Sequence, residues 1–208
     1  MKQYYQSGRL SQHLLWLASA AGVVGLLSSR ALVALSPVAG TVAALLNPHL
    51  RREWPRYFRN GAALRAAALP LFLLLSFGYT EDWPVWRHEL FRSLTWLGVP
   101  LAFALAVPLT AGQRRAVGTL FVLGTAAVGL ATLGKYWLDP THGNQAIVMG
   151  QNVQAVTGVL HIFFGVMLAL SAFWGVVLAR QPAARPVLRV ALGVGAAAAT
   201  IALHVLAY

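Results

Sequence analysis

Long apolar runs separated by short basic stretches are the feature that most constrains what this chain can fold into. Of its 208 residues, 58% are hydrophobic and 10% are charged, whereas soluble domains carry about 25% charged residues. The core of a bilayer has no water to bond the backbone, so a spanning segment must be a helix or part of a closed barrel. The runs are too long and too continuously apolar for barrel strands. The sequence therefore predicts an all-α, polytopic transmembrane helix bundle.

About seven helices are expected, because seven apolar segments can be distinguished. They cover residues 14–27, 31–46, 66–77, 94–109, 117–133, 159–179 and 187–208. Several are shorter than the roughly 20 residues that cross a bilayer at 1.5 Å per residue. The first two segments suggest a tight hairpin that turns at residues 28–30. We expect a single transmembrane helical domain over residues 1–208.

The distribution of lysine and arginine predicts the orientation of the bundle. With the N-terminus in the cytoplasm, most basic residues fall in inner segments and four of the five acidic residues fall in outer ones. The inner basic residues are Lys2, Arg9, Arg51, Arg52, Arg56, Arg59, Arg65, Arg114, Arg115, Arg180, Arg185 and Arg189. The outer ones are Arg30, Arg87, Arg92 and Lys135. This bias sets the topology of membrane proteins, so we expect a multi-pass membrane protein with a cytoplasmic N-terminus.

Charge and composition also exclude several classes of function. The formal net charge of +11 is explained by topology, since no soluble basic domain is present to bind nucleic acid. The absence of cysteine rules out disulfides, thiolate metal sites and cysteine nucleophiles. The chain has no HExxH motif, glycine-rich phosphate loop or paired-carboxylate motif. No metal and no cofactor are expected.

The first predicted outer loop, residues 79–92, mixes acids, bases and aromatic rings. A helix that starts near Val85 would place His88 and Arg92 four residues apart on one face. The planar fork of arginine suits phosphate. Aromatic rings suit both sugars and lipid headgroups. An interfacial helix that only anchors the chain remains the simpler interpretation of this loop.

Two further groups of polar residues lie near the predicted outer face. The second outer loop, from Lys135 to about Thr157, contains the amides Asn144, Gln145, Gln151, Asn152 and Gln154. Amides match sugar hydroxyls and water equally well. His161 and His204 fall at similar depth in the last two segments. They could ligate a haem or a metal, but a hydrogen bond between the two helices is the simpler expectation.

Residues 79–108 contain three short motifs: Tyr-Thr-Glu-Asp, Arg-His-Glu-Leu-Phe-Arg, and Leu-Gly-Val-Pro-Leu-Ala-Phe-Ala-Leu-Ala-Val-Pro. The inner-loop run Leu-Thr-Ala-Gly-Gln-Arg-Arg follows them. Together these motifs resemble the bacterial O-antigen ligase/polymerase family. The run from His161 to Gly165 is similar to the aromatic start of the family's next long helix. The resemblance extends over most of the chain as a loose pattern of hydropathy and short motifs.

The resemblance implies a membrane glycosyltransferase of lipopolysaccharide biosynthesis in the cell envelope. Such enzymes transfer a glycan from an undecaprenyl-diphosphate carrier at the outer face of the inner membrane, without a metal. Family members are about twice as long, and their best-known catalytic residues lie beyond the part matched here. The chain would then be the N-terminal half of the enzyme, with the catalytic residues unknown. The resemblance implies that Tyr79, Glu81 and Arg92 lie beside the carrier lipid.

The charged residues of the predicted outer face complete the candidate site. Arg87, Arg92 and Lys135 are the cations expected to hold the diphosphate, and His161 is a further candidate for substrate binding. The expected partners are the lipid bilayer and a polyprenyl-diphosphate-linked glycan. The competing interpretations are a non-enzymatic membrane protein, such as a transporter subunit or scaffold, and a b-type cytochrome that uses His161 and His204.

Overall fold

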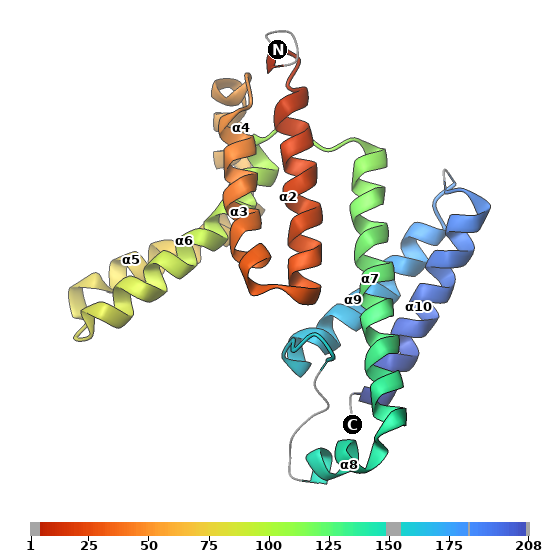
Figure 1. Cartoon of the computed structure of the whole chain (residues 1–208). Coiled ribbons are helices and arrows are strands. Elements are labelled where there is room, and N and C mark those ends of the chain that lie inside the picture. The colour runs from red at the N-terminus through yellow and green to blue at the C-terminus, as the bar shows by residue number, and fades with distance from the viewer. Residues whose placement is uncertain (1–4, 149–154, 183, 207–208) are drawn as a thin grey trace. The chain divides into compact units, whose positions relative to one another are not determined.

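The computed structural model describes residues 5–148, 155–182 and 184–206, and these residues form helices and no strand. Figure 1 shows their order along the chain. The elements are α2 (Arg9–Ser28), α3 (Arg30–Leu45), α4 (Leu50–Arg59), α5 (Gly61–Leu75), the 3-10 turn η1 (Ser76–Tyr79), α6 (Trp83–Leu105), α7 (Ala111–Leu138), α8 (Pro140–Val148), α9 (His161–Ala179) and α10 (Pro186–Leu206). The predicted all-α class is confirmed for the described part of the chain.

Four of these helices are long and apolar enough to cross a membrane: α2, α7, α9 and α10. The helices α3 and α4 form a bent pair that would count as a fifth span, with an angle of 112° between them. Each of the seven predicted segments overlaps one of the helices α2, α3, α5, α6, α7, α9 and α10. The structure therefore supports a membrane protein, with four of the expected spans meeting the length and composition of a bilayer-crossing helix.

The chain forms two compact units. The first contains residues Met1–Gly22 and Ala31–Ala111, and the second contains Val23–Arg30 and Gly112–Tyr208. The helix α2 contributes its first part to one unit and its last turns to the other. The predicted hairpin between the first two segments is confirmed, because α2 ends at Ser28, α3 begins at Arg30, and Ser11 near the start of α2 bonds the Ala43 carbonyl near the end of α3.

In the core of the first unit, polar side chains form hydrogen bonds with backbone groups near the ends of helices. Ser11 is fully buried; its hydroxyl donates to the Ala43 carbonyl at 2.7 Å and accepts from the Val107 amide at 3.1 Å. Buried Asn47 donates from Nδ2 to the Leu105 carbonyl at 2.6 Å. These bonds fix the α3–α4 turn and the segment after α6 against α2. Without them, buried backbone groups would be left unpaired.

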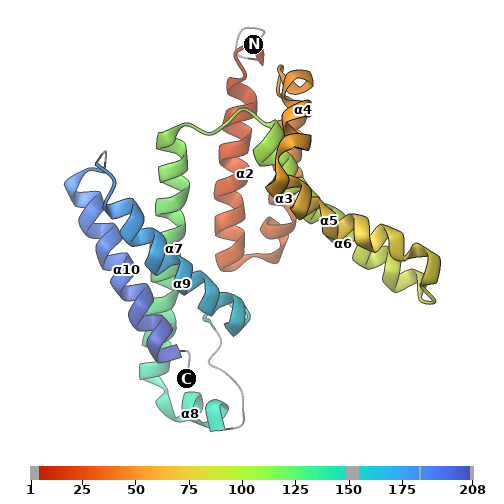
Figure 2. The same cartoon turned by 180° about the vertical axis from the view of Figure 1, so that it is seen from behind.

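Small residues bring the helices of the second unit close together. A Cβ added at Gly175 of α9 would lie 2.8 Å from the Ala196 Cβ and 3.1 Å from the Leu192 carbonyl oxygen, both on α10. In the same unit, Ala199 and Ala202 of α10 have no exposed surface. Figure 2 shows α9 and α10 side by side. A Cβ added at Gly195 of α10 would likewise lie 3.2 Å from the Leu123 side chain of α7. Small residues allow such close approach in membrane helices.

Two predicted loops contain more helix than the sequence indicated. The stretch between the second and third segments includes α4, with Leu50, Trp54, Tyr57 and Phe58 at helical spacing. The second outer loop includes α8, and Lys135 lies in the last turn of α7 rather than at the start of that loop. The sequence-based boundaries followed only the apolar runs, so helical turns with mixed composition were missed. Gln151, Asn152 and Gln154 lie outside the described residues.

We expect Gly175→Ala to destabilise the protein, because its new methyl group would meet the backbone of α10. Overpacking of this kind costs about 1–3 kcal/mol. Gly193→Ala is a matched control in α10, where an added Cβ has nothing within 4 Å. The measurement is thermal unfolding of the full chain in detergent. Equal midpoints for the two variants would contradict the close packing of α9 on α10.

Candidate functional site at the end of the α5–α6 hairpin

The candidate site is built where α5 turns back into α6. The two helices lie side by side in both views, and η1 joins them at the end of the hairpin (Figures 1 and 2). Asp82 is the N-cap of α6, and its carboxylate accepts from the Val85 amide at 3.1 Å. Pro84 follows in the first turn, where its missing amide hydrogen is not needed. The cap therefore starts α6 at Trp83, slightly earlier than the predicted Val85.

Three aromatic rings form a cluster at this end of the hairpin. The ring centroids of Phe77, Trp83 and Trp86 lie 4.8–5.6 Å apart in edge-on arrangements. The Trp86 indole donates to the Leu73 carbonyl at 2.9 Å and to the Ser76 hydroxyl at 3.1 Å. These bonds tie α6 to the end of α5. Clustered tryptophans prefer the headgroup level of a bilayer, so this end of the hairpin has the character of a membrane interface.

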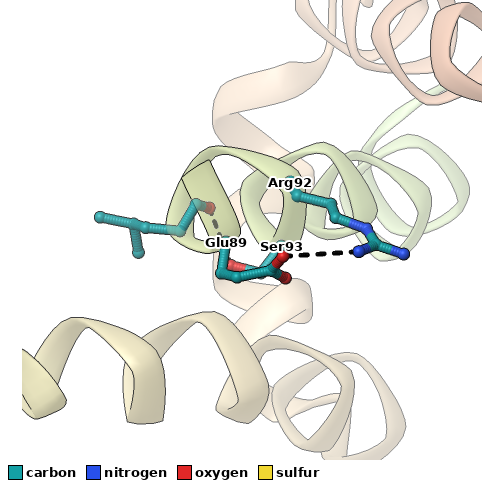
Figure 3. Close-up of polar contacts among 4 residues, drawn as sticks. Glu89, Arg92 and Ser93 are labelled. Atoms are coloured by element: carbon teal, nitrogen blue, oxygen red, sulfur yellow. Dashed lines mark hydrogen bonds and ion pairs between the residues drawn. The ribbon is translucent and has the colours of Figure 1, made fainter. Parts of the chain in front are cut away.

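Arg92 lies on the α6 surface beyond the aromatic cluster. It follows Trp86 by six residues, which is about 9 Å along a helix axis. Its Nη1 atom lies 3.5 Å from a carboxylate oxygen of Glu89, and the two side chains are 68% and 45% exposed. Figure 3 shows the guanidinium extending beside α6 toward Glu89, while the neighbouring Ser93 hydroxyl bonds the Leu90 carbonyl at 2.8 Å. An exposed pair of this kind leaves the arginine accessible to an external anion.

Most of the other predicted residues on this hairpin are also exposed. Tyr79 is 72% exposed at the end of η1, and Glu81 and Arg87 are exposed around the start of α6. His88 is exposed one turn before Arg92. The structure thus places Tyr79, Glu81 and Arg87 at one hairpin end and Arg92 further along α6, all as surface residues rather than as the lining of a closed cleft.

The remaining candidates, Lys135 and His161, belong to the second unit. Lys135 is exposed in the last turn of α7, and His161 is a partly buried residue that begins α9. His204 is an exposed residue near the end of α10. Among the described residues, no group of three or more His, Asp or Glu side chains could hold a metal ion.

Polar residues of α8 form a shallow hollow in the second unit. Thr141, Asn144, Gln145 and Val148 line it, with a volume of about 350 Å³. The Tyr136 hydroxyl donates to the Asn144 side-chain oxygen at 2.8 Å, which ties α8 to α7. Amides there can bond sugar hydroxyls. The hollow is lined by a single helix, so it offers less shape for recognition than an enclosed cleft.

No protein-family model matches this chain, and no curated protein or solved structure matches it. The family resemblance of residues 79–108 therefore stays a prediction. Sequence reasoning identified the charged residues of the hairpin but missed the bonds made by the Trp86 indole. The signal was weak: Ser76 lies ten residues before Trp86, and only the hairpin geometry brings the two together.

We expect Trp86→Phe to loosen the end of the hairpin while keeping an aromatic ring in the cluster. The variant loses the indole donor to Leu73 and Ser76, at a cost of about 1 kcal/mol. Trp137→Phe is the control, because Trp137 is 71% exposed on α7. Thermal unfolding in detergent should show a lower midpoint for Trp86→Phe alone. An unchanged midpoint would show that these bonds do not hold the hairpin.

Proposed function

We propose that this chain is a polytopic protein of the bacterial inner membrane that binds a polyprenyl-diphosphate-linked glycan and takes part in its transfer. The proposal combines the resemblance to O-antigen ligases with the exposed cations at the end of the α5–α6 hairpin. The observation that carries it is Arg92, a largely exposed arginine on a helix that continues into an apolar run. Ionisable residues at membrane depth are costly and typically functional.

The topology that this function requires has seven membrane helices and a cytoplasmic N-terminus. The lysine and arginine distribution supports it, since the reverse orientation would invert the bias that sets topology. In this arrangement α3, α5 and α6 also cross the membrane, although α3 and α5 have only 16 and 15 residues. The end of the α5–α6 hairpin then faces the periplasm, the side on which the carrier presents its glycan.

Cysteine labelling tests this orientation directly, because the native chain contains no cysteine. Asn60 and Asn144 are both exposed and should lie on opposite sides of the membrane. In intact cells, a membrane-impermeant maleimide should label Asn144→Cys and should label Asn60→Cys only after permeabilisation. Labelling of Asn60→Cys in intact cells would overturn the orientation and, with it, the periplasmic placement of the hairpin end.

Arg87 and Arg92 would hold the diphosphate of the carrier, while the aromatic cluster would set the depth of the hairpin end. The planar guanidinium can donate two parallel hydrogen bonds to phosphate oxygens. In glycan transfer, the bond between the sugar and the diphosphate breaks, and the diphosphate leaves with the bonding electrons. Cations already in place would stabilise this charge as it develops.

We expect Arg92→Ala to weaken binding of undecaprenyl diphosphate by the purified full chain about tenfold, the loss typical of one charge-assisted hydrogen bond. Arg92→Lys should restore binding only in part, because lysine keeps the charge but loses the fork. Arg114→Ala removes an exposed arginine from α7 and serves as the control. Undecaprenol, which lacks the diphosphate, should bind weakly to every variant. Equal binding of both lipids by the unmodified chain would overturn the proposal.

The same variants separate transfer from simple anchoring in cells. Arg92→Ala should reduce the glycan ladder on lipopolysaccharide at unchanged protein abundance. A normal ladder at normal abundance would leave Arg92 as an interfacial anchor. A non-enzymatic transporter subunit or scaffold would likewise leave the ladder unchanged in every variant.

A further inference from the structure

The helix α4 has two sharply different faces. Leu50, Trp54, Tyr57 and Phe58 share one side of the helix, at spacings of four, seven and eight residues. Four arginines occupy much of the remainder, against one acidic residue, Glu53. Arg51, Arg52 and Arg59 are exposed. Amphipathic helices of this composition lie in the interface of anionic membranes, with the apolar side toward the acyl chains and the basic side toward the headgroups.

Only part of the apolar side of α4 is used for packing within the chain. Tyr57 is 6% exposed and belongs to the core cluster of the first unit, and Leu50 packs against the same cluster. Trp54 and Phe58 are 46% and 54% exposed, although Trp54 stacks on Tyr57 and Phe58 meets the same ring edge-on. The fold therefore holds one edge of the apolar face and presents the adjacent edge outward.

The direction of α4 is fixed by its junction with α3. The axis turns by 112° between the two helices. Asn47 secures this turn, because its Oδ1 atom accepts from the His49 amide at 2.9 Å while Nδ2 binds the Leu105 carbonyl. In the topology proposed above α3 crosses the membrane, so α4, which turns by 112° from it, runs close to the membrane surface. The buried Asn47 thus sets α4 in the orientation that an interfacial helix requires.

We propose that α4 is a binding site for anionic phospholipid headgroups. Trp54 and Phe58 enter the acyl boundary, and Arg51, Arg52 and Arg59 bind phosphodiester groups of the surrounding lipids. The favoured occupant follows from charge complementarity, since the basic face of α4 matches a negatively charged lipid surface. The inference is independent of the proposed glycan carrier, because it concerns a different helix and a different lipid.

A reporter on α4 can distinguish anionic from zwitterionic lipids. Asn60 is exposed at the C-cap of α4, and Asn60→Cys gives a single cysteine for a bimane label. The full chain is reconstituted in vesicles of phosphatidylcholine and phosphatidylglycerol of fixed composition. A doxyl group, which quenches bimane fluorescence, is placed on the acyl chain of either phosphatidylglycerol or phosphatidylcholine. The quenching ratio is the quenching by doxyl-phosphatidylglycerol divided by the quenching by doxyl-phosphatidylcholine. We expect a ratio of about two, because basic residues enrich anionic lipids around them.

Substitutions then assign the enrichment to the arginines of α4. Replacing Arg51, Arg52 and Arg59 together by Gln should bring the quenching ratio close to one. The matched control replaces three other exposed arginines, Arg114, Arg180 and Arg185, by Gln, which removes the same charge. The control should keep the ratio. Replacement by Lys at the three α4 positions should also keep most of it, because the attraction depends on charge.

Salt and the aromatic residues provide two further readouts. About 1 M NaCl shortens the screening length to about 3 Å, so it should lower the ratio toward one in the unmodified chain. Trp54→Ala with Phe58→Ala should reduce quenching by both lipids, because α4 would lie less deeply. Monodisperse elution of each variant verifies folding. A ratio near one in the unmodified chain at low salt, or equal loss in the α4 triple variant and in its control, would overturn the proposal.

Discussion

Buried hydrogen bonds to the backbone at helix ends are the constraint on which the first unit depends. In this unit α6 ends at Leu105, and the chain continues without helix before α7 begins. The carbonyls and amides around this break need partners, because burying them unpaired costs more than the net value of a hydrogen bond. Ser11 and Asn47 supply those partners inside the core, and the Gln12 side-chain amide adds an exposed bond to the Pro108 carbonyl at 2.6 Å. These side chains from earlier in the sequence hold the end of α6 in place, and Asn47 also holds the turn into α4.

In the second unit, close contact between small residues brings the helices together. Side-chain hydrogen bonds also join its elements, as in Ser171, whose buried hydroxyl donates to the Val122 carbonyl at 3.1 Å. Glycines and alanines on α7, α9 and α10 let neighbouring backbones approach, which increases dispersion contact between helices that lipid alone would not press together. A side-chain hydrogen bond to the backbone tolerates some change in the volume of nearby side chains, whereas a close contact at a glycine does not.

The sequence predicted helices well where one physical property dominated. Each long apolar run corresponds to a helix, and the Ser28–Arg30 turn was placed correctly because it interrupts the apolar runs. Helices of mixed composition, such as α4 and α8, were not predicted, because they lack a continuous apolar run. They are stabilised by tertiary contacts and by their position at the surface. The candidate site shows the same division. Arg92 was evident from its charge, but the partners of Trp86 depend on the fold of the hairpin.

The two arginine-rich regions of the first unit illustrate how position changes the meaning of charge. In α4 the arginines lie together on a short helix with exposed aromatic rings beside them, so a layer of many headgroups can satisfy them at once. On α6, Arg87 and Arg92 stand on a 23-residue helix whose later turns are apolar, and Arg92 lies beside one acid. An arginine at such a position must extend toward the interface or meet a discrete anion. The first arrangement favours a diffuse lipid surface, and the second favours a single phosphate-bearing ligand.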